Sequence, residues 1–124
     1  MIYHIIKKID EYYLSISYYI SINKLKYKDM EEMCFSYVEY IIDIKNKNAT
    51  LIILKTNNKY KKKGYATKIL KESLNYLKNK LNIEKIELDD MSDRSWDIYN
   101  NIYVNLGFKY INDYPEPEMI LYLN

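Results

Sequence analysis

The chain is poor in the residues that most often bind metals and form crosslinks. Cys34 is the only cysteine and His4 the only histidine in 124 residues, so no disulfide can close within the chain and no His/Cys cluster has zinc spacing. We therefore expect no metal cofactor and a reducing, cytoplasmic location. Only two glycines and two prolines are present, and no linker rich in these residues divides the chain. We expect residues 1–124 to form a single domain.

Long apolar runs and a strong net charge are also missing. No stretch approaches the ~18 apolar residues of a membrane-spanning helix, and the first residues, MIYHIIKKIDEYY, lack the long apolar region of a signal peptide. The net charge of +2 is too small to be typical of a nucleic-acid-binding domain. We therefore expect neither a membrane nor a nucleic acid as a partner.

The first half of the chain carries the pattern of β-strands. Four apolar segments, the first two rich in Ile and Tyr with partial alternation, predict strands over 2–9, 12–22, 34–44 and 50–54. Asp10-Glu11 and the polar segment 45–48 are the expected turns within the first and second pairs. A polar connection, 23–32, joins the two pairs. Four strands before any helix indicate an antiparallel sheet.

The apolar period then changes from that of a strand to that of a helix. Apolar residues recur at steps of three and four from near Tyr65: Ala66, Ile69, Leu70, Leu74, Leu77 and Leu81. A strand over 83–88 follows, and then a second helix that includes Tyr99, Ile102, Tyr103 and Leu106 and is closed by Gly107. The final strands are expected over 108–111 and 119–123. The pattern predicts an α+β fold, with a mixed, mostly antiparallel sheet flanked by helices.

Residues 50–67 form an expected strand, a short basic loop and the start of a helix. The first turn of a helix has unpaired N–H groups and a partial positive charge, so it can bind a phosphate. Gly64 and Ala66 are small enough to let a phosphate approach the backbone, and Lys61–Lys63 add positive charge. Taken on composition alone, a surface turn with solvated lysines is the simpler interpretation.

Two motifs favour the phosphate-binding interpretation. The loop Lys61-Lys62-Lys63-Gly64-Tyr65-Ala66 resembles the acyl-CoA loop of GNAT acetyltransferases, Arg/Gln-x-x-Gly-x-Gly/Ala, with Lys61 in place of Arg or Gln. The block from Ile102 to Lys109 is similar to the family's helix-ending Tyr-x-x-x-Gly-Phe pattern. Each motif is weak alone, but together they occur in the family's order, separated by a helix and a strand. The resemblance covers Leu51 to Leu123.

The resemblance implies a GNAT-like acyl-CoA N-acyltransferase fold and an acetyl-CoA-dependent N-acetyltransferase. In the family, an amine attacks the thioester directly in a ternary complex with the cosubstrate. The backbone of Leu54, Lys55 and Thr56 would then bind the pantetheine arm, with an N–H facing the developing oxyanion. The pyrophosphate of coenzyme A would be bound at Lys61, Lys62, Lys63, Gly64, Tyr65, Ala66 and Thr67.

The resemblance also suggests catalytic residues. Tyr103 occupies the position from which family members donate a proton to the coenzyme A thiolate, although a tyrosine on this helical stripe is more often part of the core. Some relatives carry a glutamate base on the strand before the loop, but residues 50–58 contain none. Glu39 and Asp90 are the alternative bases, and each could also be an ordinary solvated carboxylate.

Three features depart from the family pattern. Trp96 stands where relatives often have an asparagine that contacts the cofactor, and segment 89–95 is about four residues longer than the usual connection. The N-terminal helical region is reduced, because there is no room between the first two strands for the helices that the family places there. The acceptor site is then either open or completed by a second subunit, as in a homodimer.

The acceptor and the activity itself stay open at this point. Carboxylates near the family's acceptor position favour a small cationic amine, such as a polyamine, or a protein amine: Asp89, Asp90, Asp93, Glu116 and Glu118. Lys61, Trp96 and the missing glutamate suggest an alternative, a coenzyme A-binding or protein-interaction module that has lost acetyl transfer. A nucleic-acid binder that uses residues 59–65 is a weaker alternative, since one short basic run offers little area.

Overall fold

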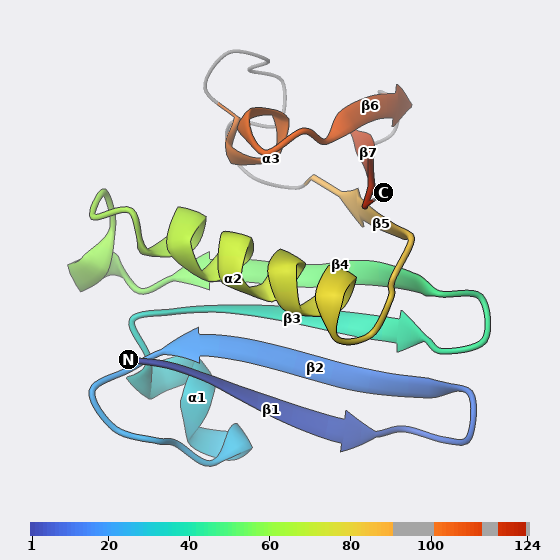
Figure 1. The fold of residues 1–124 in the computed structure, drawn as a ribbon. Helices are drawn as coiled ribbons and strands as arrows, with labels where there is room; N and C mark the ends of the chain where they lie inside the picture. The colour runs from blue at the N-terminus through green and yellow to red at the C-terminus, as the bar shows by residue number, and fades with distance from the viewer. Residues whose placement is uncertain (91–100, 113–116, 124) are drawn as a thin grey trace.

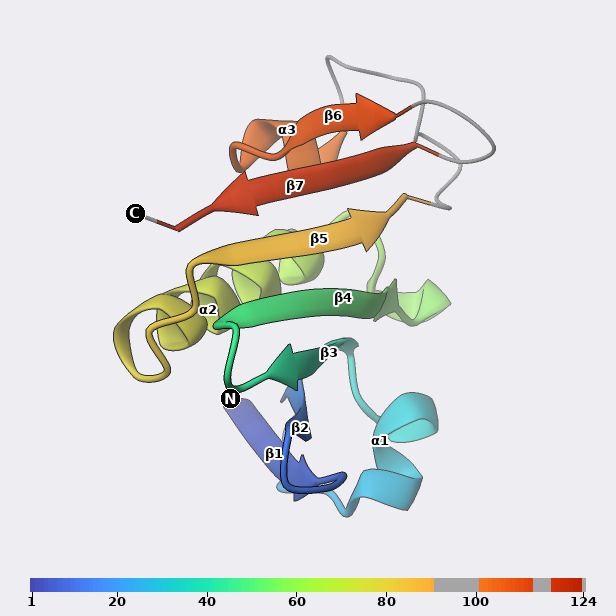
Figure 2. The same ribbon diagram turned by 90° about the vertical axis from the view of Figure 1, so that its right-hand side faces the viewer.

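The computed structural model describes residues 1–90, 101–112 and 117–123 of the chain. These residues form β1 (Ile2–Lys8), β2 (Tyr13–Ile20), α1 (Tyr27–Met33), β3 (Ser36–Asp43), β4 (Asn48–Thr56), the 3₁₀ turn η1 (Asn58–Tyr60), α2 (Tyr65–Asn79), β5 (Lys85–Asp89), α3 (Ile102–Asn105), β6 (Lys109–Asn112) and β7 (Glu118–Tyr122). The strands form one seven-stranded sheet in the order β1-β2-β3-β4-β5-β7-β6 (Figures 1 and 2). Every neighbouring pair is antiparallel except β4 and β5, which are parallel. The expected α+β fold is confirmed.

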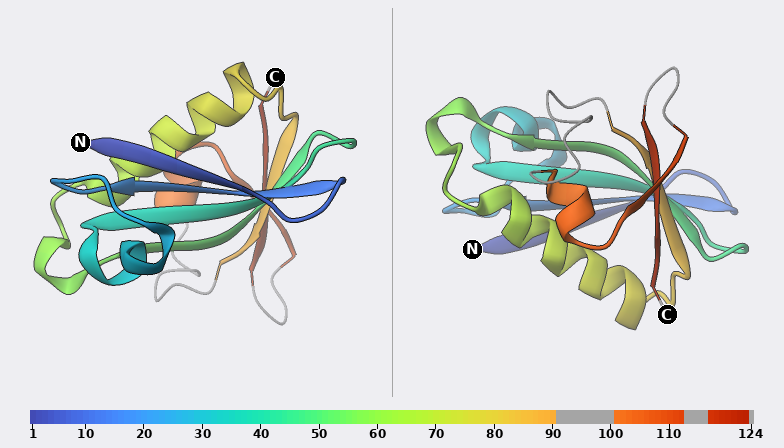
Figure 3. Two further views of the ribbon diagram at one scale, coloured as in Figure 1. Left: turned by 90° about the horizontal axis from the view of Figure 1, so that it is seen from below. Right: turned by 90° about the horizontal axis from the view of Figure 1, so that it is seen from above.

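The helices α1 and α2 cover opposite faces of the sheet (Figure 3). Alternate side chains of the strands, such as Tyr18 on β2 and Tyr40 on β3, pack with Ile69 and Leu70 of α2 in the main hydrophobic core. The residues between them point to the other face, where Tyr19 and Met30 belong to a smaller core under α1. The period of two along each strand therefore gives the sheet two apolar faces, each with its own helix.

Helix α2 begins at the expected residue and ends slightly earlier than expected. Its buried residues are Ile69, Leu70, Ser73, Leu74 and Leu77. The prediction that Leu81 continues the helix is wrong, because α2 ends at Asn79 with Lys80 as its C-cap. Asn82 follows in the left-handed region at φ 55 and turns the chain into β5.

Helix α1 is the element that the sequence pattern did not predict. It begins inside the segment 23–32, which was predicted as a polar connection, and ends one residue beyond it at Met33; Met30 is its only buried residue. Its N-cap residue, Lys26, makes no side-chain capping hydrogen bond, so the usual start signal of a helix is missing. The connection between β1 and β2 is a short turn, in which the Asp10 carboxylate accepts hydrogen bonds from the N–H groups of Tyr12 and Tyr13.

Two further findings concern the helices. The second predicted helix is confirmed over α3, while Tyr99 lies outside the described residues. The prediction that Leu106 belongs to this helix is wrong, because α3 ends at Asn105 with Leu106 as its C-cap. None of the helices in the described part of the chain is long and apolar enough to cross a membrane.

Candidate functional site

Strand β4 separates from β5 part-way along its length. It pairs with β3 from Asn48 to Thr56, but with β5 only over Asn48–Thr50. Figure 3 shows β5 and β7 running across the direction of β1 to β4. The register between β3 and β4 shifts so that Ile52 lies opposite no residue of β3, and such a bulge bends a strand. The end of β4 therefore extends past the paired part of β5.

The loop between β4 and α2 has a backbone suited to an anion. Lys62 and Gly64 adopt left-handed conformations, at φ 63 and φ 80. Gly64 is the N-cap residue of α2 and has no side chain with which to cap this helix, so the N–H groups of its first turn face outward. A Cβ atom placed on Gly64 would meet no heavy atom within 4 Å. The space in front of the helix start is therefore open to a ligand.

The loop is attached to the start of β3 by an aromatic cluster. The ring of Phe35 stacks on that of Tyr60 with centroids 4.1 Å apart and lies 5.5 Å from that of Tyr65. The Asn57 side chain donates to the Cys34 carbonyl, and its backbone N–H donates to the Phe35 carbonyl at 3.0 Å. These contacts preorganise the loop, and sequence reasoning did not single out Phe35 or Asn57.

The end of β4, the loop and α3 surround one cavity of about 740 Å³. Its lining includes nine of the ten residues that the sequence suggests for coenzyme A: Leu54, Lys55, Thr56, Lys61, Lys62, Gly64, Tyr65, Ala66 and Thr67. Lys63 is exposed beside it and is not part of the lining. Tyr103 and Ile102 of α3 close the cavity on the other side. The two sequence motifs, separated by a helix and a strand, thus meet at one place.

Tyr103 is the tyrosine of α3 that lines this cavity. Only 7% of its surface is exposed, and its ring packs edge-on against Phe108 at 5.6 Å. Burial raises the pKa of its hydroxyl well above the ordinary value of 10.0, and the nearby Asp90 carboxylate raises it further. The phenol therefore keeps its proton throughout the neutral range and can act as a hydrogen-bond donor.

Asp90 lies immediately after β5 in a buried polar network. It is 2% exposed, and its carboxylate accepts a hydrogen bond of 2.6 Å from the Asn101 side chain. The other side-chain atom of Asn101, Oδ1, accepts from the backbone N–H groups of Tyr103 and Val104 at the start of α3. Asp90 does not line the cavity that contains Tyr103. Asn101 was not predicted from the sequence, although an asparagine just before a short helix is a common N-cap.

Glu39 lies on β3, on the side of the sheet that α1 covers. Its carboxylate accepts hydrogen bonds from Tyr27 at 2.8 Å and from Ser15 at 3.3 Å. The bond to Glu39 raises the pKa of the Tyr27 hydroxyl above its ordinary value. Like Asp90, Glu39 does not line the cavity that contains Tyr103.

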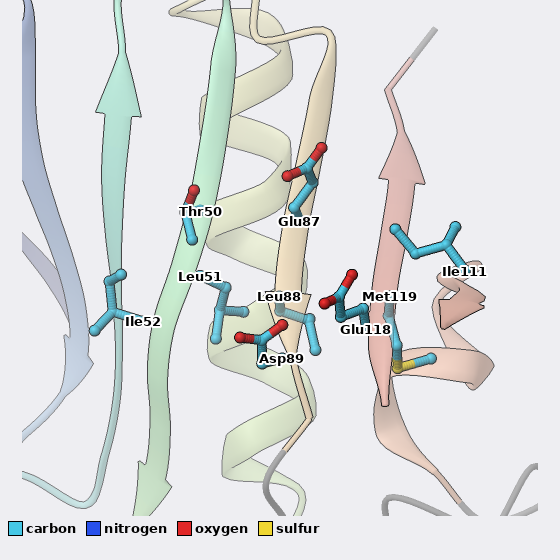
Figure 4. A pocket seen from close by; sticks show the side chains of 9 residues that line it. All are labelled: Thr50, Leu51, Ile52, Glu87, Leu88, Asp89, Ile111, Glu118 and Met119. Atoms are coloured by element: carbon cyan, nitrogen blue, oxygen red, sulfur yellow. The ribbon is translucent and has the colours of Figure 1, made fainter. Parts of the chain in front are cut away.

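A second cavity, of about 380 Å³, lies where β4, β5 and β7 approach one another. Figure 4 shows three carboxylates on the sheet face away from α2, those of Glu87, Asp89 and Glu118. Thr50 and Ile52 of β4 also line it, so it adjoins the bulge. Asp89 and Glu118 were predicted from the sequence as acceptor-site carboxylates. Glu87 was not, although the strand alternation around Leu88 could have indicated it.

Several sequence predictions fall on residues outside the described ranges. Trp96, Asp93 and Glu116 are among them. Within the described ranges, no group of three or more His, Cys, Asp or Glu side chains could hold a metal ion.

Comparison with known proteins identifies the fold. No protein-family model matches the chain, and no curated protein matches its sequence. Three solved structures superpose well: a GNAT-family acetyltransferase from Staphylococcus aureus (TM-score 0.64, 17% identity, 89% of this chain and 68% of that chain), the ribosomal-protein-S18-alanine N-acetyltransferase from Escherichia coli (0.63, 17%, 93% and 72%), and a spermidine/spermine N-acetyltransferase from Vibrio cholerae (0.65, 16%, 93% and 68%). The chain therefore has the fold of the GNAT acetyltransferases, as its two motifs predict.

Proposed function

We propose that the protein is an acetyl-CoA-dependent N-acetyltransferase that moves an acetyl group to a primary amine by direct attack in a ternary complex. The observation that carries the proposal is the single cavity that joins the end of β4, the Lys61–Thr67 loop and Tyr103. The solved structures with this fold include N-acetyltransferases that act on spermidine and on a ribosomal protein.

The loop and the end of β4 would bind coenzyme A. The first-turn N–H groups of α2 and the Lys61 and Lys62 ammonium groups would bind the pyrophosphate, because a helix N-terminus and formal positive charge both favour an anion. The backbone of Leu54–Thr56, beyond the part of β4 that pairs with β5, would bind the pantetheine arm. Gly64 fits this role, since its left-handed backbone and open front leave room for a phosphate.

Tyr103 would stabilise the departing thiolate. Its raised pKa lies above that of an alkyl thiol, about 8.5, so complete proton transfer to sulfur is uphill. We infer that Tyr103 acts chiefly as a hydrogen-bond donor while the C–S bond breaks. Any proton that it gives to sulfur would return from solvent.

The amine would approach from the face of the sheet that points away from α2. The smaller cavity lies beside the β4 bulge, and Glu87, Asp89 and Glu118 line it. A carboxylate there could take the ammonium proton, directly or through water, before the nitrogen attacks the acetyl carbon. Glu39 and Asp90 stay predictions for this base, but the geometry favours the cavity-lining carboxylates.

Calorimetric titration with acetyl-CoA tests the cofactor site. The parent protein should bind acetyl-CoA with micromolar affinity. The variant Gly64→Glu places bulk and negative charge in front of α2, so it should lose this binding. Gly64→Asn is the matched control: asparagine tolerates the left-handed conformation and adds no charge, so it should bind more tightly than Gly64→Glu. Equal binding by the parent and Gly64→Glu would place coenzyme A elsewhere.

Turnover separates the enzyme from the second candidate, a coenzyme A-binding or protein-interaction module. The observation that favours the module is that neither predicted base, Glu39 or Asp90, lines either of the two cavities described above. Acetylation should be measured with spermidine, an aminoglycoside, and peptides that offer a lysine or a free N-terminus. Binding without acetylation of any of these amines would favour the module.

A further inference from the structure

The buried carboxylate of Asp90 connects three parts of the chain. Its own backbone N–H donates to the Pro117 carbonyl at 2.7 Å, which joins the end of β5 to the residue before β7. Its side chain accepts from Asn101 at 2.6 Å, just before α3. A carboxylate that is only 2% exposed loses much of its hydration, so it is retained only where hydrogen bonds compensate.

Asn101 links the Asp90 carboxylate to the backbone of Tyr103. Its Oδ1 accepts from the Tyr103 N–H at 2.8 Å and from the Val104 N–H at 3.3 Å. Since the Asn101 amide group is planar, the bond from its Nδ2 to Asp90 also fixes the direction of Oδ1. Helix α3 has only four residues, and a helix that short is not stable by itself. Its orientation therefore depends on this cap and on the packing of Tyr103 against Phe108.

Asp90 also acts on Tyr103 through its charge. Among the residues that the structure describes, the Asp90 carboxylate after β5 and the Tyr40 phenol on β3 interact electrostatically with the Tyr103 hydroxyl. The carboxylate favours the protonated, hydrogen-bond-donating form of Tyr103.

We propose that Asp90 is a positioning residue: it holds the Asn101 cap so that α3 presents the Tyr103 hydroxyl to the cavity where the acetyl group is transferred. The proposal rests on the N-acetyltransferase function proposed above and gives Asp90 a role different from that of a base. A base must reach the amine, whereas Asp90 is buried and lines neither cavity.

The variants Asp90→Ala and Asp90→Asn distinguish the two roles. Asparagine keeps an oxygen that can accept from Asn101 but cannot act as a base at neutral pH. If Asp90 positions Tyr103, Asp90→Ala should lower kcat about 100-fold, the scale of a misplacement of about 1 Å, and Asp90→Asn should restore most of it. The Kd for coenzyme A should stay within about threefold in both variants, because Asp90 does not line the cofactor cavity. A loss as large in Asp90→Asn as in Asp90→Ala would overturn the proposal in favour of a base.

A double-mutant cycle with Tyr103→Phe tests whether Asp90 acts through Tyr103. Residues that act as one unit are not additive, so Asp90→Ala should change kcat less than about twofold when Tyr103 is already phenylalanine. The same fold-loss in both backgrounds would overturn the proposal. If Asp90→Ala does not fold, Asn101→Ser replaces it in the cycle, because serine can cap α3 but is too short to bridge to Asp90.

Hydrogen exchange keeps the proposal testable if the parent protein shows no turnover. That result would refute the proposed function, but not the contact between Asp90 and the α3 cap. The Tyr103 and Val104 amides should then exchange faster in Asp90→Ala than in the parent protein, while the amides of α2 remain unchanged. Unchanged exchange at Tyr103 and Val104 would overturn the positioning role itself.

Discussion

Replacing Ser73 by alanine should destabilise the fold more than replacing Tyr40 by phenylalanine, although both changes break the same hydrogen bond. The two hydroxyls lie 2.7 Å apart, and both side chains are 0% exposed. Ser73 also donates to the Leu70 carbonyl at 3.0 Å. Since Ser73 has one hydroxyl proton, the proton between the two oxygens belongs to Tyr40. Tyr40 is therefore the donor and Ser73 the acceptor.

The direction of this bond determines the cost of each change. Tyr40→Phe removes the donor and leaves Ser73 bonded to Leu70, so it should cost about 1 kcal/mol, the net value of one hydrogen bond. Ser73→Ala leaves the Tyr40 O–H buried without an acceptor, which should cost about 2 kcal/mol. The double variant leaves neither group unsatisfied, so it should be more stable than Ser73→Ala alone.

Urea unfolding followed by circular dichroism measures these differences. With a typical urea m-value, a difference of 1 kcal/mol shifts the midpoint by about 0.5 M, which is easily resolved. An m-value unchanged across the variants would show that the comparison is between the same two states. A Tyr40→Phe midpoint at or below that of Ser73→Ala would refute the assigned direction of the bond, as would a double variant less stable than either single one.

Three further predictions concern other parts of the structure. Gly107→Ala should lower the free energy of unfolding by about 1–3 kcal/mol, because φ is +101 and the new Cβ would lie 3.3 Å from Leu121 Cδ1. A thermal melt would show this as a lower Tm. Burial raises the pKa of the Cys34 thiol from 9.0 to about 11. The contribution of the buried thiol to stability is therefore full below pH 9 and lost as pH rises towards 11. The Tm of Cys34→Ala should accordingly fall less than that of the parent protein between about pH 8 and pH 11. A double change of Lys61 and Lys62 to alanine should weaken acetyl-CoA binding in a titration and reduce its salt dependence.

The strands and the long helix could be predicted from the sequence because their apolar periods differ. The partial alternation along β1 and β2 and the three- and four-residue steps from Ala66 to Leu77 each fit one element. Helix α1 could not be predicted in this way, since seven residues with one buried methionine and no side-chain cap leave no clear pattern. Its position depends instead on the apolar face of β1–β3 that it covers.

Some parts of the candidate site could likewise be predicted from the sequence, and others could not. The coenzyme A loop could be located from its motif, because the glycine, the lysines and the helix start are adjacent in the chain. The bulge at Ile52 could not, since it exists only in the register between β3 and β4. The link from Asp90 to Asn101 joins residues 11 positions apart, and a sequence pattern does not say which buried polar groups will pair.

The short pairing between β4 and β5 affects how the molecule can come apart. Only three residue pairs of the β4–β5 ladder join β1–β4 to β5–β7. This short ladder forms a seam between two smaller sheets. The side chains cross that seam: one buried cluster includes Ile16 of β2, Leu70 of α2, Ile86 of β5 and Met119 of β7. Opening the seam slightly would cost few hydrogen bonds, whereas pulling the halves fully apart would expose the whole core. The shared core therefore contributes more than the backbone ladder to holding the two parts of the sheet together.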